Sequence, residues 1–168
     1  MAITVCFDEQ LEALLELWPD EPVPLPAPTP PMAALSVSVA DGTTECALPH
    51  DAAAPAAARQ VTRKLLAGCG LPDTVIDSAL IVTSELVTNA VEHALAPLML
   101  HLHPKQAGRV WIGVTDGGPA PYDGPWTASC SADEHGRGRS IVDTLADSHG
   151  SHTHANGHTT HWARISAA

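Results

Sequence analysis

The stretch from Pro72 to about Ala94 constrains the fold more than any other part of this sequence. Pro72 followed by an acid is typical of a helix start. At 100° per residue, four of its apolar side chains fall on one side of the predicted helix: Ile76, Leu80, Val87 and Val91. A helix with one apolar side buries that side against a second layer, so we expect it to lie against a sheet.

Shorter patterns before and after this helix predict the strands of that sheet. Apolar runs bounded by turn residues predict strands at residues 35–39, 43–48, 98–102, 109–115, 149–155 and 158–165. Two further helices are expected, over residues 52–67 and through residues 140–146. Asn156 and Gly157 predict a two-residue turn between the last two strands. This order predicts an α/β fold, a two-layer α/β sandwich in which helices back one sheet.

The beginning of the chain differs in character from the rest, so we divide it into residues 1–33 and a compact domain at residues 34–168. Residues 7–18 repeat leucine at helical spacing, with Asp8 placed to cap the helix start. Seven of the thirteen residues in 19–31 are proline, which predicts a stiff, extended linker. Three interpretations stay open: an arm packed on its own domain, a detachable acidic docking helix, and disorder.

The charge of the chain excludes one class of partner. The formal net charge is −11, whereas a nucleic-acid-binding protein needs a basic surface to meet phosphates. No apolar run approaches the roughly 20 residues that span a bilayer, and the start of the chain lacks a signal-peptide pattern. We therefore expect a cytoplasmic protein without membrane contact. The four cysteines form no C-x-x-C pair and are expected to be free thiols.

Polar groups gather on the side of the long helix opposite its apolar residues: Glu85, Asn89, Glu92 and His93. Glu85 and Asn89 are four residues apart, so their side chains are neighbours. A carboxylate beside an amide oxygen suits Mg²⁺, which takes one or two protein oxygens and completes its shell with water and phosphate. The same carboxylate can accept a proton from an attacking hydroxyl. Taken alone, the pair is more simply explained as an exposed polar helix face.

Two loops add groups of complementary chemistry. Asp116 ends an apolar strand and precedes Gly117 and Gly118, so its carboxylate can accept from an exocyclic amine while the glycines let backbone approach a flat ring. Residues 136–139 read Gly-Arg-Gly-Arg just before a helix. The amides of a helix N-terminus together with two guanidinium groups make a phosphate cradle. Taken singly, a strand-to-turn acid and a plain loop-to-helix junction also explain these two loops.

Four segments follow one another in a familiar order and spacing: ELVTNAVEHA, TDGGPAP, HGRGRSIVDTLAD and NGHTTHWARI. Through them, the chain from about Leu35 to Ile165 resembles the GHKL (Bergerat) ATP-binding family. In its short form it is similar to anti-sigma regulatory factors of the serine-kinase type. The resemblance implies the histidine-kinase-like ATPase fold, with ATP and Mg²⁺ as cofactors.

The resemblance also implies roles for single residues. Glu85 matches the catalytic carboxylate, and Asn89 matches the magnesium ligand beside the nucleotide. Asp116 matches the acid that recognises adenine, with Gly118 giving close backbone approach. The other residues expected to contact the nucleotide are His93, Gly136, Arg137, Gly138, Arg139 and Thr160. For His93, a helix-end contact with backbone is an equal alternative.

Proteins of this type use ATP to phosphorylate a serine or threonine of an anti-sigma antagonist (STAS-type) protein, and they hold a sigma factor until partner switching releases it. The resemblance therefore implies a protein serine/threonine kinase that regulates transcription without direct contact to nucleic acid, often as a homodimer. A non-catalytic regulator that acts by docking alone is the alternative. The presence of both Glu85 and Asn89 favours the kinase.

The last two expected strands are rich in histidine. With a two-residue turn between them, His152 faces His161 and His154 lies on the same face. Three imidazoles at that spacing could hold Zn²⁺ or Ni²⁺. A solvated outer face of the sheet is the favoured interpretation, and the alternation of side chains then directs Thr160 toward the helices.

Overall fold

The structure is a computed structural model that describes residues 35–40, 42–105, 108–121 and 137–167. The predicted N-terminal helix and proline-rich linker lie outside the described residues, so the division at residue 33 stays a prediction. Cys46 and Cys69, the two cysteines within the described ranges, are free thiols, as expected.

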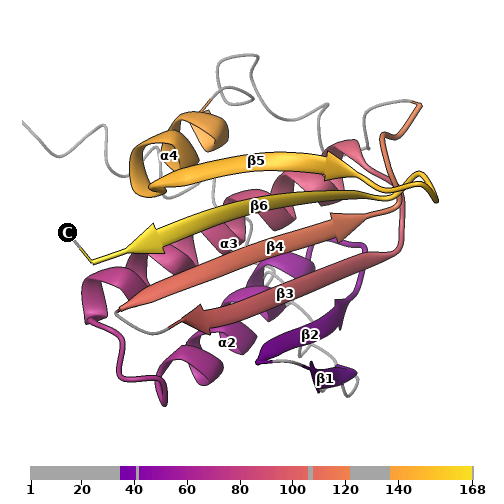
Figure 1. Cartoon of the computed structure of the whole chain (residues 1–168). Helices are drawn as coiled ribbons and strands as arrows, with labels where there is room; N and C mark the ends of the chain where they lie inside the picture. Colours follow the sequence, from indigo (N-terminus) through magenta and orange to yellow (C-terminus); the bar gives the residue numbers. More distant parts are fainter. Residues whose placement is uncertain (1–34, 41, 106–107, 122–136, 168) are drawn as a thin grey trace, which may run out of the picture. The chain divides into compact units, whose positions relative to one another are not determined.

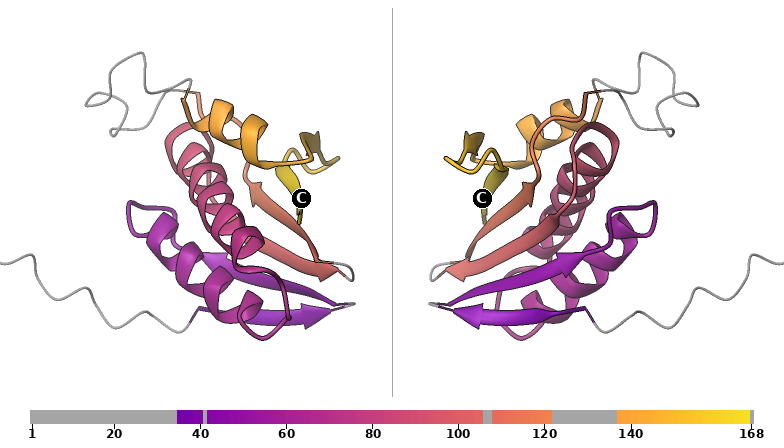
Figure 2. Two further views of the ribbon diagram at one scale, coloured as in Figure 1. Left: turned by 90° about the vertical axis from the view of Figure 1, so that its left-hand side faces the viewer. Right: turned by 90° about the vertical axis from the view of Figure 1, so that its right-hand side faces the viewer.

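One six-stranded antiparallel sheet carries the fold, with the strand order β1-β2-β3-β4-β6-β5. The strands are β1 (Val37–Ala40), β2 (Thr43–Leu48), β3 (Leu98–Lys105), β4 (Arg109–Asp116), β5 (Ser148–Thr153) and β6 (Thr159–Ser166). The described helices are α2 (Ala54–Leu66), α3 (Asp73–His93) and α4 (Arg137–Leu145). Figures 1 and 2 show the helices on one side of the sheet, with the other face open. The predicted two-layer α/β sandwich is confirmed.

Helix α3 forms the centre of the helical layer. Its buried side chains are Val75, Ala79, Leu80, Val82, Thr83, Leu86, Val87, Ala90 and Val91. All of them except Leu80 and Thr83 belong to the same core cluster as the buried side chains of the two central strands, Leu98, Leu100, Leu102, Val110, Ile112 and Val114. Three of the four predicted sheet-facing residues are buried, and Ile76 packs partly buried against the core. Since each fully buried Leu or Val contributes roughly 1.5–3 kcal/mol, this interface fixes α3 against the sheet.

By length and mean hydropathy, α3 is long and apolar enough to cross a membrane, contrary to the expectation that no apolar run is long enough to do so. Half of its apolar stretch is buried within the protein. The core helix of a folded domain can have the same length and hydropathy, and the buried residues of α3 account for its apolar character.

The connection between β5 and β6 is longer than the predicted two-residue turn. The amide of His154 donates to the carbonyl of His158 (2.8 Å), and the amide of Gly157 donates to the carbonyl of His154 (2.9 Å). Residues 154–158 therefore form the loop, with Gly157 at a φ of +86°. The resulting register pairs His152 with Thr160. Because side chains alternate along a strand, a slip of one residue exchanges the two faces of the sheet.

This register corrects the predicted faces of β6. His161 lies opposite the buried Val114 of β4, which places it on the helix side of the sheet, whereas Thr160 lies opposite Thr115 on the open face. His152 and His154 thus lie on the face opposite to His161, and the predicted grouping of three histidines is wrong. Within the described ranges, no group of three His, Cys, Asp or Glu side chains could hold a metal ion.

Candidate functional site

The end of β4 is fastened to the end of α3. The amide of Leu95 donates to the carbonyl of Gly118 (2.8 Å), and the amide of Gly117 donates to the carbonyl of Leu95 (2.7 Å). A third hydrogen bond joins Ala120 to the carbonyl of His93 (2.9 Å). These contacts bring the polar side of α3 beside the strand end that carries the predicted adenine-recognising acid.

Gly117 is required at this junction because its neighbours leave no room for a side chain. A Cβ there would run into the carbonyl of Ala96 and would lie 2.8 Å from the carbonyl oxygen of Leu95. We expect Gly117→Ala to lower the free energy of unfolding by about 2 kcal/mol, as overpacking does, measured by urea denaturation. Gly68→Ala is the control, since a Cβ at Gly68 meets nothing within 4 Å. Equal stability of the two variants would contradict this account of the junction.

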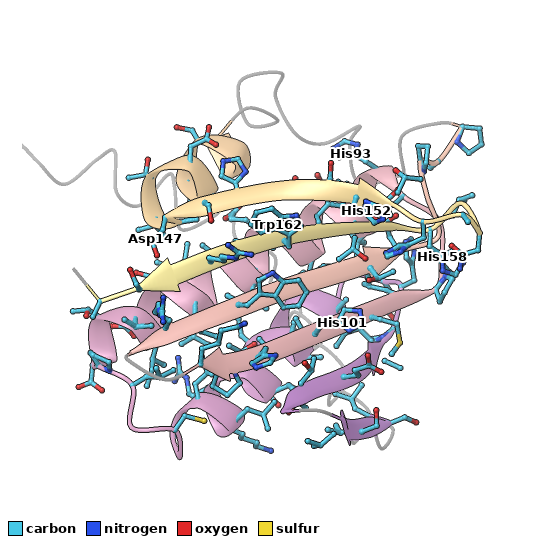
Figure 3. All side chains as sticks on the ribbon, in the orientation of Figure 1. His93, His101, Asp147, His152, His158 and Trp162 are labelled. Atoms are coloured by element: carbon cyan, nitrogen blue, oxygen red, sulfur yellow. The ribbon has the colours of Figure 1, made fainter. Side chains whose placement is uncertain are left out.

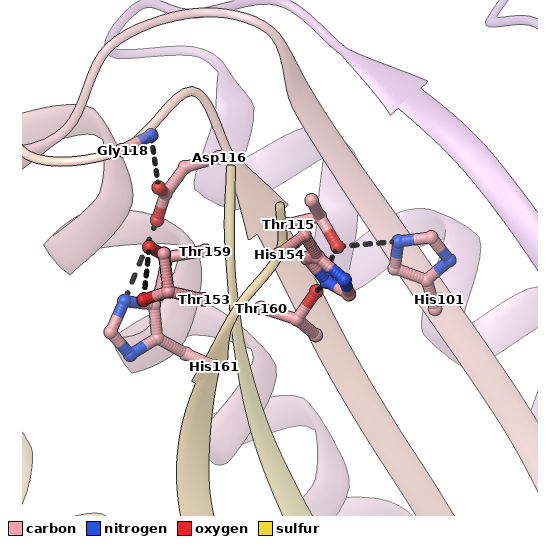
Figure 4. Close-up of polar contacts among 9 residues, drawn as sticks. All are labelled: His101, Thr115, Asp116, Gly118, Thr153, His154, Thr159, Thr160 and His161. Atoms are coloured by element: carbon pink, nitrogen blue, oxygen red, sulfur yellow. Dashed lines mark hydrogen bonds and ion pairs between the residues drawn. The ribbon is translucent and has the colours of Figure 1, made fainter. Parts of the chain in front are cut away.

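Asp116 is buried where β4 ends, with a side-chain exposure of 2%. Its Oδ1 accepts a hydrogen bond from the amide of Gly118 at 2.8 Å. Its Oδ2 is buried and has no hydrogen-bond partner among the described residues. The Nε2 of His161 approaches Oδ2 at 3.5 Å (Figure 4), which is an ion-pair distance and longer than a good hydrogen bond. A buried carboxylate oxygen without a hydrogen-bond partner is suited to accept a hydrogen bond from a ligand.

Asp116 lines a cavity of about 720 Å³ between α3, α4 and the β5–β6 edge of the sheet. Its lining residues are Leu86, Asn89, Ala90, His93, Ala94, Asp116, Pro119, Val142, His149, Gly150, Ser151, Thr153, Thr159, His161 and Trp162. Ligand sites typically have volumes of roughly 300–1,000 Å³ and mostly apolar walls with a few polar groups. This cavity therefore fits a ligand of nucleotide size.

Asn89 and His93 lie one turn apart on α3 and both line the cavity with Asp116. His93 also contacts the carboxylate of Glu92 at 3.7 Å. Glu85 lies one turn before Asn89 and is not among the described lining residues. Partial burial, and second the charge of Glu92, raise the pKa of the Glu85 carboxyl above its usual value. A raised pKa makes this carboxylate a better proton acceptor once it is ionised.

The predicted phosphate cradle falls mostly at the start of α4. The helix begins at Arg137, so Arg137, Gly138 and Arg139 belong to its first turn rather than to a preceding loop. Gly136 lies outside the described residues. Further along α4, Asp143 contacts His149 of β5 at 2.7 Å, which ties the helix to the rim of the cavity. The contact of residues 136–139 with phosphate stays a prediction.

Thr160 does not join this group of residues. Its hydroxyl hydrogen-bonds to Thr115 (2.7 Å) and to His154 (2.7 Å) on the open face of the sheet. The adjacent Thr159 lies opposite Asp116 and lines the cavity. The sequence analysis named Thr160 alone and expected it on the helix side, because a two-residue turn would direct it there; the longer loop puts Thr159 on that side instead. The same turn placed His161 on the outer face, whereas the structure has it line the cavity.

A second cavity, of about 500 Å³, lies on the open face. Its described lining includes His101, His152 and Trp162 (Figure 3), with mostly apolar surface and no acidic residue. The cavity beside Asp116 is the stronger candidate because, of the two, it alone is lined by a buried carboxylate, one oxygen of which has no hydrogen-bond partner among the described residues.

Comparison with known families agrees with this geometry. A family model described as the histidine kinase-like ATPase domain matches residues 48–164, which include α3, Asp116 and both strands at the rim of the cavity. The chain belongs to the histidine kinase-like ATPase family. Membership in this family implies that the chain binds ATP.

Among solved structures, the chain is similar to the RsbU and RsbW domains of Rv1364c from Mycobacterium tuberculosis. The TM-score is 0.56 and the identity 22%, over 74% of this chain and 32% of that chain. This chain thus spans about a third of the length of that chain, and the likeness shows a shared fold. The curated proteins contain no match to the sequence.

Proposed function

We propose that this chain is an ATP-dependent protein serine/threonine kinase of the anti-sigma regulator type. It binds ATP in the cavity beside Asp116 and phosphorylates a serine or threonine of an anti-sigma antagonist (STAS-type) protein. The observation that carries the proposal is the buried Oδ2 of Asp116, which has no hydrogen-bond partner in the described part of the chain. An adenine amine supplies the missing donor.

The second part of the proposal is the orientation of the phosphates. Asn89 and Asp116 line the same cavity from α3 and β4, so a nucleotide whose base meets Asp116 can extend its phosphates along α3. The amide oxygen of Asn89 is a hard neutral ligand of the kind that Mg²⁺ takes alongside phosphates and water. A magnesium ion bound there would offset phosphate charge. Arg137, Arg139 and the backbone at Gly136 and Gly138 would close over the phosphates from the start of α4.

The chemical step assigned to this chain is the removal of a proton. Glu85 precedes Asn89 by one helical turn, and its raised pKa favours acceptance of the proton from the substrate hydroxyl. The oxygen of that hydroxyl forms a bond to the γ-phosphorus while the bond to the β-phosphate oxygen breaks, and ADP leaves. No covalent intermediate with the protein is needed.

The partners follow from the motif resemblance, not from the cavity. A sigma factor would dock away from the nucleotide and would be released when the kinase binds the antagonist. The kinase would act in the cytoplasm as a homodimer. The net charge of −11 favours basic docking surfaces on these partners. A regulator that docks without phosphotransfer would share the fold but would not need Glu85.

A thermal-shift measurement tests the nucleotide site. We expect ATP with Mg²⁺ to raise the melting temperature with ligand concentration, because a ligand present at about 100 Kd stabilises by about 2.7 kcal/mol. ATP without Mg²⁺ should stabilise less. Incubation with Mg-ATP and antagonist domains, followed by detection of phosphoserine or phosphothreonine, then tests the kinase. ATP-dependent stabilisation without phosphotransfer to any antagonist domain would favour the docking regulator, and no stabilisation would refute the site itself.

A further inference from the structure

Neither the sequence motifs nor the proposed mechanism assigns a role to His161. It lies on β6 on the helix side of the sheet and lines the cavity together with Asp116. We infer that His161 is a second base-reading residue, which donates a hydrogen bond to the purine ring nitrogen next to the amine bound by Asp116. This inference rests on the proposed function, since it requires that a purine enters this cavity.

The neighbouring carboxylate decides which nitrogen of His161 carries a proton. A carboxylate can only accept, and the nitrogen that approaches Oδ2 of Asp116 at 3.5 Å is Nε2. Asp116 therefore favours the tautomer with hydrogen on Nε2. The side chain of His161 is 45% exposed, so its ring can turn slightly toward a ligand. The cavity thus presents one buried acceptor and one adjacent donor.

An acceptor beside a donor matches the edge of adenine. The exocyclic amine donates and the adjacent ring nitrogen N1 accepts, so Asp116 Oδ2 and His161 Nε2 can satisfy both. A base whose amine reaches Oδ2 lies against the imidazole, because that ring is the group that approaches this oxygen. The pair therefore reads two neighbouring atoms of one base.

Guanine fits the same pair less well. It offers two adjacent donors, N1–H and the N2 amine, and needs two acceptor oxygens. Oδ2 of Asp116 has no hydrogen-bond partner among the described residues, whereas Oδ1 already accepts from Gly118 at 2.8 Å. When one of these donors reaches Oδ2, the other faces the N–H of His161, and two donors that face each other are costly. The pair thus selects adenine over guanine.

The test compares ATP with 1-deaza-ATP, in which a C–H group replaces the ring nitrogen N1. Dissociation constants are measured by calorimetry for the wild type, His161→Phe and His161→Gln. We expect the wild type to bind 1-deaza-ATP about tenfold more weakly than ATP, the effect of one lost hydrogen bond. His161→Phe should bind both nucleotides equally, and His161→Gln, which keeps a donor, should recover part of the difference. A merely structural role would change both affinities by the same factor.

His152→Phe is the matched control, because His152 lies on the open face and lines the other cavity. It should keep the wild-type preference for ATP over 1-deaza-ATP. If the wild type binds ATP and 1-deaza-ATP equally well, the inference is wrong but the ATP site stands. The same conclusion follows if His161→Phe keeps the full preference for ATP over 1-deaza-ATP. That comparison within the wild type holds even if the phenylalanine variant does not fold. Failure of the wild type to bind ATP refutes the proposed function and this inference together.

Discussion

Asp116→Asn should weaken ATP binding by a factor of at least about 100 while leaving the nucleotide-free protein as stable as the wild type. The amide oxygen can keep the hydrogen bond to Gly118, which leaves the amide nitrogen where Oδ2 now lies. A donor then faces the donor of the base, and sites built around one hydrogen bond reject such mismatches strongly. The measurement is the ATP dissociation constant, with the melting temperature of both proteins recorded without ligand.

The stability of this variant separates binding from folding. Asp116 is a buried acid, and one of its oxygens has no hydrogen-bond partner among the described residues, so a neutral amide removes the desolvation cost of a charge. We therefore expect no loss of unfolding free energy beyond about 1 kcal/mol. Asp147→Asn changes the same charge at an exposed position outside the cavity and should bind ATP normally. Wild-type ATP affinity in Asp116→Asn would remove the basis of the proposed site.

Glu85→Gln should lower the rate of phosphotransfer by a factor of about 10² to 10⁴, the usual contribution of a general base, and should leave ATP affinity nearly unchanged. Glutamine keeps the size of the side chain but cannot take the proton. Initial rates at saturating ATP measure the effect. Phosphotransfer at the wild-type rate in this variant would exclude Glu85 as the proton acceptor.

The pH dependence gives an independent check on Glu85. Partial burial, and second the charge of Glu92, raise the pKa of Glu85, so the rate should fall as the pH drops through that raised value. Glu92→Gln removes one of the two causes and should move this acidic limb to lower pH. Between the unfolded and the folded pKa, the folded protein binds more protons than the unfolded chain. Stability should therefore fall as the pH rises through this window, and Glu85→Gln should abolish that slope.

Hydrophobic periodicity was sufficient to predict the layers of the fold. The predicted α3 and the observed helix, Asp73–His93, differ by about a residue at each end, and β2 has the predicted bounds, Thr43–Leu48. Their patterns are long or regular, and the buried positions repeat with the helical or strand period. Asp116, predicted to recognise adenine because it follows an apolar strand directly and precedes two glycines, lines the cavity; its contact with adenine stays a prediction.

The sequence did not predict the details that depend on one residue of register. Asn156-Gly157 is a strong hairpin signal, but the structure closes a longer loop at residues 154–158. The longer loop exchanges the expected faces of β6, so Thr159 and His161 line the cavity and Thr160 does not. Local turn preference competes here with the pairing of β6 along the whole of β4, and the longer pairing decides the outcome.

The route by which β6 enters the sheet has a consequence for biosynthesis. β6 (Thr159–Ser166) lies between β4 and β5 in the sheet, although it follows both in the sequence. A ribosome therefore completes α3 and Asp116 more than forty residues before the strand that supplies Thr159 and His161. Pairings between such distant segments form late in folding. The nascent chain should consequently remain unable to hold nucleotide until β6 has emerged and inserted, and ATP retention by stalled chains of increasing length would report that moment.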